Sequence, residues 1–299
     1  MPKIRFVEET LGLIIRNRKG LRVPLNQRSY AWKRAHVKDL YTDLNGALRA
    51  GAEEYFLGSI IVVAPEKADY VEVYDGQQRI ATTIILLGAI RDFMQTTLND
   101  PKEAGIITEQ YLIGAERRNQ EVPKFTLSSA DRDYFVNRVL RPPDNADRQA
   151  AVVRKESHEL INEAALEAAD FVKTVTKSLH ADAQANTLQI WIDYLEKSAR
   201  VIWVEVQDQA TAYRIFETMN DRGLKLSAAD LVKNYLYSLV SEANAPKITY
   251  HWQSMTATLE SLGHEDRDAV DYLRYLWIAD HGHTRSTDLF DKTSVPGRS

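Results

Sequence analysis

A run of five residues, Asp75 to Arg79, carries the densest set of side chains that could do chemistry. It places one carboxylate, two amides and one guanidinium around Gly76, which lets a ligand approach the backbone closely. Guanidinium and amide groups donate hydrogen bonds to phosphate, so the run predicts a phosphate site. The alternative that the residues leave open is structural: Asp75 caps a helix, Arg79 pairs with a surface carboxylate, and nothing binds.

The sequence around this run, VEVYDGQQRIATTIILL (residues 71–87), predicts the elements that position it. Val71 and Val73 alternate as in a strand, which stops at the Asp-Gly pair. Ile80, Ile84 and Leu87 then recur at helical spacing. We therefore expect a strand, a tight loop and a helix, with the backbone N–H groups of the helix N-terminus facing past the strand end as an anion site.

Composition limits the class of protein. The chain has 299 residues, 44% of them hydrophobic, which allows one large or two modest domains with proper cores. It contains no cysteine, which excludes disulfides and thiolate metal sites. No apolar run approaches the roughly 20 residues needed to span a bilayer, and the charged N-terminus does not fit a signal peptide. We expect a cytoplasmic protein that does not contact a membrane.

Basic residues are concentrated near the N-terminus. Residues 1–50 carry eleven Lys or Arg and four Asp or Glu, a local charge of +7, although the whole chain has a net charge of −4. Tyr30 and Trp32 lie among them and could stack beside phosphate contacts, which predicts a nucleic-acid surface. A solvated charged face, with both rings pinning a loop to the core, is the alternative. The residues assigned to DNA contact are Arg16, Arg18, Lys19, Arg22, Tyr30, Lys33 and Arg34.

The remaining patterns predict an α+β fold in two domains, residues 1–141 and 145–290, joined by the linker Arg141-Pro142-Pro143-Asp144. We expect helices over residues 6–16, 34–49, 77–98, 131–140, 146–177 and 182–199, with two more within 247–281. We expect strands over residues 21–25, 55–65, 71–74 and 199–207, with two weak strands within 110–127. The strand at 55–65 should pair with the one at 71–74.

A second informative stretch, ATAYRIFETMNDRGLKLSAADLVKNYLYS, covers residues 210–238. It predicts two helices joined at Asn220-Asp221-Arg222-Gly223, the second one capped by Ser227. Three polar residues in succession on a well-capped corner are what a rigid polar site would use. The same residues also suit a simple turn, and the pattern does not decide between the two.

Four stretches together resemble the N-terminal domain of the GmrSD family of restriction proteins, which includes phosphorothioate-sensing SspE-like proteins. They are LRVPLNQRSYAW, EYFLGSIIV, VEVYDGQQRIATTIILL and FETMNDRGLKLSAADLVKNYLYS, and the resemblance spans roughly residues 4–290. It implies a small ParB-like mixed sheet with helices, followed by a mainly helical domain. It also implies a nucleoside-triphosphate hydrolase and modified-DNA sensor of a type IV-like, modification-dependent anti-phage restriction system in bacteria.

On the basis of this resemblance, we assign roles to individual residues as a hypothesis. Mg²⁺ would be the cofactor, held by Asp75, and GTP or UTP rather than ATP would be hydrolysed. Modified double-stranded DNA would be a partner, as would an HNH-type nuclease domain in the same full-length chain or in another chain. Catalytic roles fall on Asp75, Gln77, Gln78 and Arg79, and nucleotide-binding roles on Gly76, Gln27, Arg28, Asn220, Asp221 and Arg222.

Two other functions remain open from the sequence. The first is a non-catalytic DNA-recognition module in which the Asp75 to Arg79 run contacts a DNA phosphate, which nucleotide turnover would distinguish. The second is a metal-dependent DNA nickase with Asp75 and Asp221 as metal ligands, which plasmid nicking would distinguish.

Overall fold

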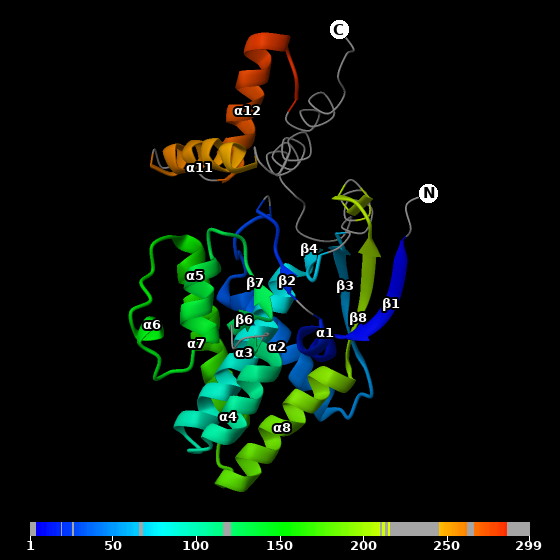
Figure 1. Ribbon diagram of the computed structural model, residues 1–299, viewed down its shortest axis with the longest axis vertical. Helices are drawn as coiled ribbons and strands as arrows, with labels where there is room; N and C mark the ends of the chain where they lie inside the picture. The colour runs from blue at the N-terminus through cyan, green and yellow to red at the C-terminus, as the bar shows by residue number, and fades with distance from the viewer. Residues whose placement is uncertain are drawn as a thin grey trace. The chain divides into compact units, whose positions relative to one another are not determined.

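The computed structural model describes residues 4–18, 20–25, 27–65, 68–115, 121–209, 211–212, 215, 245–261 and 266–285 (Figure 1). The chain divides into two compact units. The first comprises Met1–Pro24 and Ser29–Ala212, and the second comprises Leu25–Arg28 and Tyr213–Ser299.

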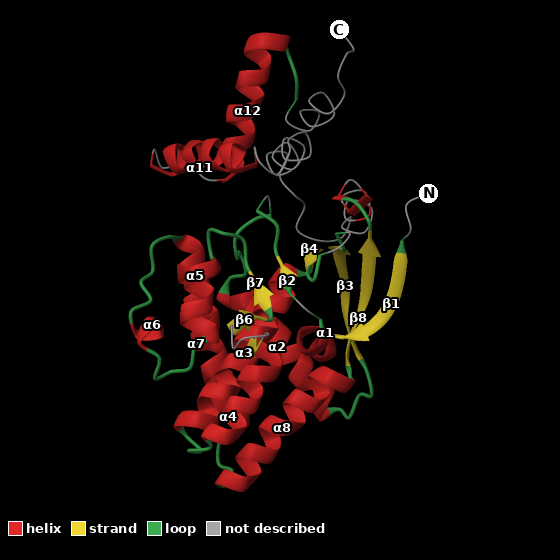
Figure 2. Ribbon diagram, viewed as in Figure 1, coloured by secondary structure: helices red, strands yellow, loops and turns green. Residues whose placement is uncertain are grey.

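A six-stranded mixed sheet organises the first unit (Figure 2). In spatial order the strands are β1 (Arg5–Thr10), β8 (Ala199–Val206), β3 (Tyr55–Val63), β4 (Val71–Asp75), β2 (Leu21–Arg22) and β7 (Phe125–Thr126). The pairs β1–β8 and β3–β4 are antiparallel, whereas β8–β3, β4–β2 and β2–β7 are parallel. This mixture of strands with many helices confirms the α+β class and the predicted pairing of the strand at 55–65 with the one at 71–74.

Helix α3 (Gln77–Thr96) is the centre of the core. Its side chains are buried on nearly every face, which explains why its sequence is apolar without a polar stripe. It packs against α7 (Glu156–Val175) and α4 (Pro101–Ile107). Helix α2 (Arg34–Arg49), confirmed as predicted, packs on α7 as well.

Helices α1 (Leu11–Asn17) and α8 (Ala181–Lys197) cross closely. A Cβ on Gly12 would lie 2.7 Å from the backbone nitrogen of Glu196, so only glycine permits this approach. The remaining elements of the first unit are short. They are the π-helical turn η1 (Thr108–Leu112), β5 (Ile113–Ala115), β6 (Glu121–Pro123), α5 (Arg132–Phe135), the π-helical turn η2 (Val136–Leu140) and α6 (Ala146–Gln149).

Arg91 fixes the end of η2 from within α3. Its side chain is fully buried and donates to the carbonyl oxygens of Val139, Leu140 and Arg141 at 2.9 Å each. The carbonyls at the end of a helix lack partners within it, so these bonds satisfy groups that would otherwise be buried unpaired.

The domain boundary expected at residues 142–144 is wrong. Strand β8 and helices α7 and α8 all follow that segment, and all belong to the first unit. The physical reason is pairing: β8 lies between β1 and β3, so both its edges are bonded within the sheet. The structure places the division after Ala212 instead.

Two of the helices expected from the sequence differ from the elements that the structure contains. Residues 6–16 form strand β1 and then helix α1, and residues 146–177 form α6 and α7 with a break between them. The two expected C-terminal helices are confirmed as α11 (Ala245–Ser261) and α12 (Asp266–His281) of the second unit. Within the described ranges, no helix is long and apolar enough to cross a membrane.

Candidate functional site

The Asp75 to Arg79 run forms the strand, loop and helix that the sequence predicts. Strand β4 ends at Asp75, and Gly76 starts α3 in the left-handed conformation with φ of 86°. A Cβ on Gly76 would lie 2.8 Å from Cγ1 of Ile60 on the neighbouring strand. Both facts require glycine here, and this N-cap residue has no side chain with which to cap α3.

Arg79 is bonded to the backbone of β3. Its Nη1 atom donates to the carbonyl oxygens of Leu57 at 2.6 Å and Ser59 at 2.9 Å. The register of β3 against β8 shifts between Phe56 and Ser59, and Gly58 there has φ of 91°. Arg79 therefore satisfies carbonyls that the irregularity removes from the ladder.

Asp75 and Arg79 also face each other. The distance from Arg79 Nη2 to Asp75 Oδ2 is 3.7 Å, and both side chains are about one quarter exposed, at 25% and 22%. Burial lowers the pKa of Arg79 below its ordinary value, and the charge of Asp75 opposes that shift. The pair leaves Arg79 charged and fixed at the edge of the loop.

The two glutamines of the run have different environments, although each is only 5% exposed. The Gln78 amide uses both ends: Oε1 accepts from the backbone N–H of Ala31 at 3.0 Å, and Nε2 donates to the carbonyl oxygen of Ser29 at 3.2 Å. The Gln77 Oε1 atom is buried, and no group in the described part of the chain donates to it.

Asp131, which the sequence patterns did not single out, directly precedes α5 and is fully buried. Its Oδ2 atom accepts from the backbone N–H of Tyr30 at 2.8 Å. Its Oδ1 atom accepts from Ser157 Oγ at 2.6 Å and lies 2.8 Å from Lys155 Nζ. In the sequence, Asp131 stands only at the start of a predicted helix, where an aspartate is typical of an ordinary N-cap.

Tyr30 does not present its ring for base stacking. It is 1% exposed, and its hydroxyl shares a 2.8 Å hydrogen bond with Thr82 Oγ1 on α3. Burial raises the pKa of Tyr30 well above its ordinary value, and the bond to Thr82 opposes that shift. The structure thus places Tyr30 in the core, the alternative that the sequence left open, and corrects its assignment to DNA contact.

Three of the arginines assigned to DNA contact pair with carboxylates. Arg16 pairs with Glu196 at 2.9 Å, Arg34 pairs with Glu167 at 2.5 Å, and Arg18 pairs with Glu9. These partners neutralise part of the basic surface that the sequence suggested.

Two other basic residues have no carboxylate partner among the described residues. Arg22 lies over the ring of Tyr70, 4.1 Å from its centroid, and Lys33 is exposed. Lys19 lies outside the described residues.

The remaining predicted site residues belong to the second unit or lie outside the described residues. Gln27 and Arg28 belong to that unit by contact, directly before Ser29 in the chain. Asn220, Asp221 and Arg222 lie outside the described residues, as does most of the predicted helix-turn-helix at 210–238.

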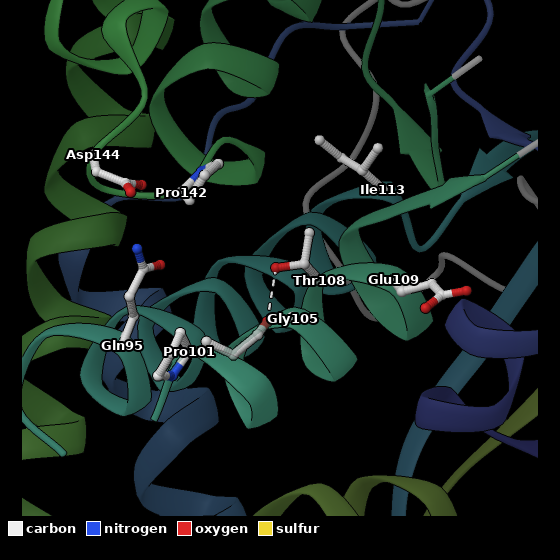
Figure 3. Close-up of a pocket in the computed structure, with 9 residues that line it drawn as sticks. Gln95, Pro101, Gly105, Thr108, Glu109, Ile113, Pro142 and Asp144 are labelled. Atoms are coloured by element: carbon white, nitrogen blue, oxygen red, sulfur yellow. Dashed lines mark hydrogen bonds between the residues drawn. The ribbon is translucent and has the colours of Figure 1, made fainter. Parts of the chain in front are cut away.

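A shallow pocket of about 320 Å³ lies between α3, α4, η1 and the 142–144 segment (Figure 3). Asp144 and Glu109 lie on either side of Thr108, whose hydroxyl donates to the carbonyl oxygen of Ala104. Gln95, which also lines it, is 18 residues from the start of α3, about 27 Å along that helix. The pocket therefore contains none of the predicted site residues.

The domain is of the α+β class: it has a mixed sheet, and a polar loop joins strand β4 to the central helix α3. Residues 10–237 match the family described as GmrSD restriction endonuclease, N-terminal domain. This match covers well over half of the chain, so the chain belongs to that family and is related to restriction systems. The comparison with curated proteins gave no match.

Proposed function

We propose that this chain is the nucleoside-triphosphate-hydrolysing and modified-DNA-sensing part of a bacterial restriction system, with its reaction at the Asp75 to Arg79 loop. The observation that carries the proposal is the junction at Gly76. A 20-residue helix begins directly after this glycine, which has no side chain to cap it, and the strand before it ends in a carboxylate. The N–H groups and the dipole at such a helix end bind phosphate, and membership of the GmrSD family supports the same function.

Asp75 is the residue that would hold Mg²⁺. No cluster of three or more His, Asp or Glu side chains that could hold a metal ion occurs among the described residues. A single carboxylate nonetheless fits, because Mg²⁺ commonly binds to one or two carboxylates together with the phosphates of the substrate. The ion, when bound, supplies charge neutralisation at the phosphoryl oxygens.

The environments of the glutamines suggest how the roles divide. The Gln78 amide is fully used by the backbone of residues 29 and 31, so we assign water orientation to Gln77. Its buried oxygen accepts from no group in the described ranges, which costs about 1–3 kcal/mol, and a hydrogen bond from the attacking water would recover this cost. Arg28 would balance phosphate charge, and Asn220, Asp221 and Arg222 would complete nucleotide binding.

Phosphate release tests the proposal. GTP, UTP, CTP and ATP are supplied with Mg²⁺, with and without DNA carrying glucosylated hydroxymethylcytosine or phosphorothioate linkages. We expect release from GTP or UTP by the unaltered chain and loss of at least 100-fold in Asp75→Ala. Circular dichroism and the urea midpoint show that the variant is folded. Undiminished release by folded Asp75→Ala would overturn the assignment.

A non-catalytic DNA-recognition module is the second candidate. The specific observation in its favour is that two of the four polar residues of the run, Gln78 and Arg79, bond to the protein backbone. Binding of modified DNA without release of phosphate from any nucleotide would establish this function instead. The DNA contacts of either function would come from the basic residues near the N-terminus, with Arg22 and Lys33 foremost. An HNH-type nuclease domain, in the same full-length chain or another chain, would cut the DNA.

A further inference from the structure

Three consecutive residues, Ser29 to Ala31, are held by side chains from two other elements. Gln78 bonds to the carbonyl of the first residue and the N–H of the third, at 3.2 and 3.0 Å. Asp131 accepts from the N–H of the second residue at 2.8 Å. Both side chains thus bond to backbone groups, as a neighbouring strand would. These bonds do not depend on which side chains residues 29–31 carry.

The side chain of the middle residue adds a further bond. The Tyr30 hydroxyl bonds to Thr82 Oγ1 at 2.8 Å, and Thr82 lies one helical turn after Gln78 on the same face of α3. Tyr30, Thr82 and Asp131 are each at most 1% exposed, and Gln78 is 5% exposed. The bonds of Tyr30 to Asp131 and Thr82 are therefore buried, and the bonds of Gln78 to Ser29 and Ala31 are partly buried.

Asp131 is itself fixed by α7. Ser157 Oγ donates to Oδ1 at 2.6 Å, and Lys155 Nζ lies 2.8 Å from the same oxygen. A carboxylate that accepts from several donors is held in one rotamer, and its charge strengthens each bond. The anchor thus extends from α3 through residues 29–31 to the start of α7.

We propose that Asp131 and Gln78 are positioning residues for the nucleotide site. They hold residues 29–31 against the start of α3, within the same unit as the Asp75 to Arg79 loop. This inference rests on the proposed nucleotide-hydrolysing function of that loop. Gln78 accordingly acts through the loop it holds and does not touch the reacting atoms.

Trypsin provides a test that does not depend on activity. It cleaves after Arg28, and the protease must bind the residues that follow in an extended form, which requires release of residues 29–31 from their anchors. We expect cleavage of the Arg28–Ser29 bond, followed by mass spectrometry, to be at least 10-fold faster in Asp131→Ala and Gln78→Ala than in the unaltered chain.

Asp92→Asn is the matched control. Asp92 lies on α3 and is also a carboxylate held by donors from the protein. It accepts from Arg91 at 2.6 Å and from Arg148 of α6. It lies 15 residues after Gln77, about 22 Å along the helix. We expect this variant to leave the rate of cleavage after Arg28 unchanged.

Kinetics then separate positioning from stability. The nucleotide used is whichever of GTP, UTP, CTP and ATP the unaltered chain hydrolyses fastest. We expect Asp131→Ala and Gln78→Ala to raise KM at least 10-fold with kcat changed less than 3-fold. Asp131→Asn, which keeps an acceptor for Tyr30, should recover part of the loss and remains informative if Asp131→Ala does not fold.

The results that would contradict the proposal are distinct from one another. Unchanged cleavage after Arg28 would overturn the anchoring, and faster cleavage with unchanged KM would overturn the role at the site. A large loss of kcat with unchanged KM would make Gln78 catalytic. Absence of hydrolysis by the unaltered chain would overturn the proposed function and the site role with it, while the cleavage rates would still report whether the anchor exists.

Discussion

Arg79 on helix α3 bonds to the carbonyl oxygen of Leu57 on strand β3, with 2.6 Å between the two atoms. The same Nη1 atom bonds to Ser59 at 2.9 Å, on the other side of Gly58. One charged side chain thus holds an irregular strand against the helix that starts at the candidate site. The arginine has a structural task whether or not it also meets a phosphate.

Arg79→Ala should lower the free energy of unfolding. It leaves two carbonyls without their donor, and we expect a cost of about 2–4 kcal/mol. Arg79→Lys keeps the charge but not the planar guanidinium, and should fall between Arg79→Ala and the unaltered chain. Urea unfolding measures the difference. A cost below about 1 kcal/mol for Arg79→Ala would show that these bonds contribute little.

Gly76→Ala should be destabilising and should distort the loop. The substitution forces a left-handed backbone on alanine and places its Cβ 2.8 Å from Ile60 Cγ1, for a combined cost of about 2–4 kcal/mol. Gly105→Ala in α4 is the control, because no atom lies within 4 Å of its Cβ position. That variant should be stabilised by up to about 1 kcal/mol in urea unfolding. Equal stabilities of the two variants would contradict the geometry at Gly76.

The salt dependence of DNA binding should depend most on Arg22 and Lys33, which have no carboxylate partner in the part of the chain that the structure describes. Each lost phosphate contact lowers the slope of log K against log salt by about 0.9. The double variant Arg22→Gln and Lys33→Gln should therefore lower the slope by about 1–2. Arg34→Gln should change it less, because that side chain is already paired with Glu167. Fluorescence anisotropy with double-stranded DNA at several salt concentrations measures the slopes. A larger change of slope in Arg34→Gln than in the double variant would indicate that α2 contacts the DNA instead.

Stability should fall as pH rises above 10. Burial raises the pKa of Tyr30 and Tyr41 above the ordinary value of 10.0, so both stay protonated in the folded chain while the unfolded chain loses these protons. The unfolded state then binds fewer protons, and each phenol removes up to about 1.4 kcal/mol of stability per pH unit. Burial lowers the pKa of Lys124, which has the opposite effect as pH rises toward 10.5.

Tyr30→Phe tests the sign of this dependence. Urea unfolding at pH 9, 10 and 11 should show a shallower fall for the variant, since one ionising phenol is removed. An equal slope in Tyr30→Phe and the unaltered chain would show that Tyr30 is not held protonated.

Local patterns predicted the elements that depend on neighbouring residues. The junction at Gly76 and the helix at 34–49 are encoded by spacing and a glycine within one stretch. Strand β1 was missed because Val7 continues the helical spacing of Leu11 and Ile14. What makes it a strand is its pairing with β8, almost two hundred residues later.

The same distinction applies to the site. The sequence showed that residues 75–79 are polar and placed at a helix start, and the structure keeps them together. It could not show that Gln78 and Arg79 bond to backbone atoms of other segments, because those bonds exist only after the chain has folded. Asp131 was missed for the same reason, since its side-chain partners come from two distant stretches, at Tyr30 and at the start of α7.

The insertion of β8 between β1 and β3 has a consequence for how the protein is made. Both neighbours of β8 leave the ribosome more than a hundred residues before it, and neither is bonded to the other in the finished sheet. Such distant pairings slow folding because a long loop must close before they form. The emerging chain therefore holds β1 and the matching edge of β3 unpaired until synthesis passes Val206, and chaperones have most to protect during that interval.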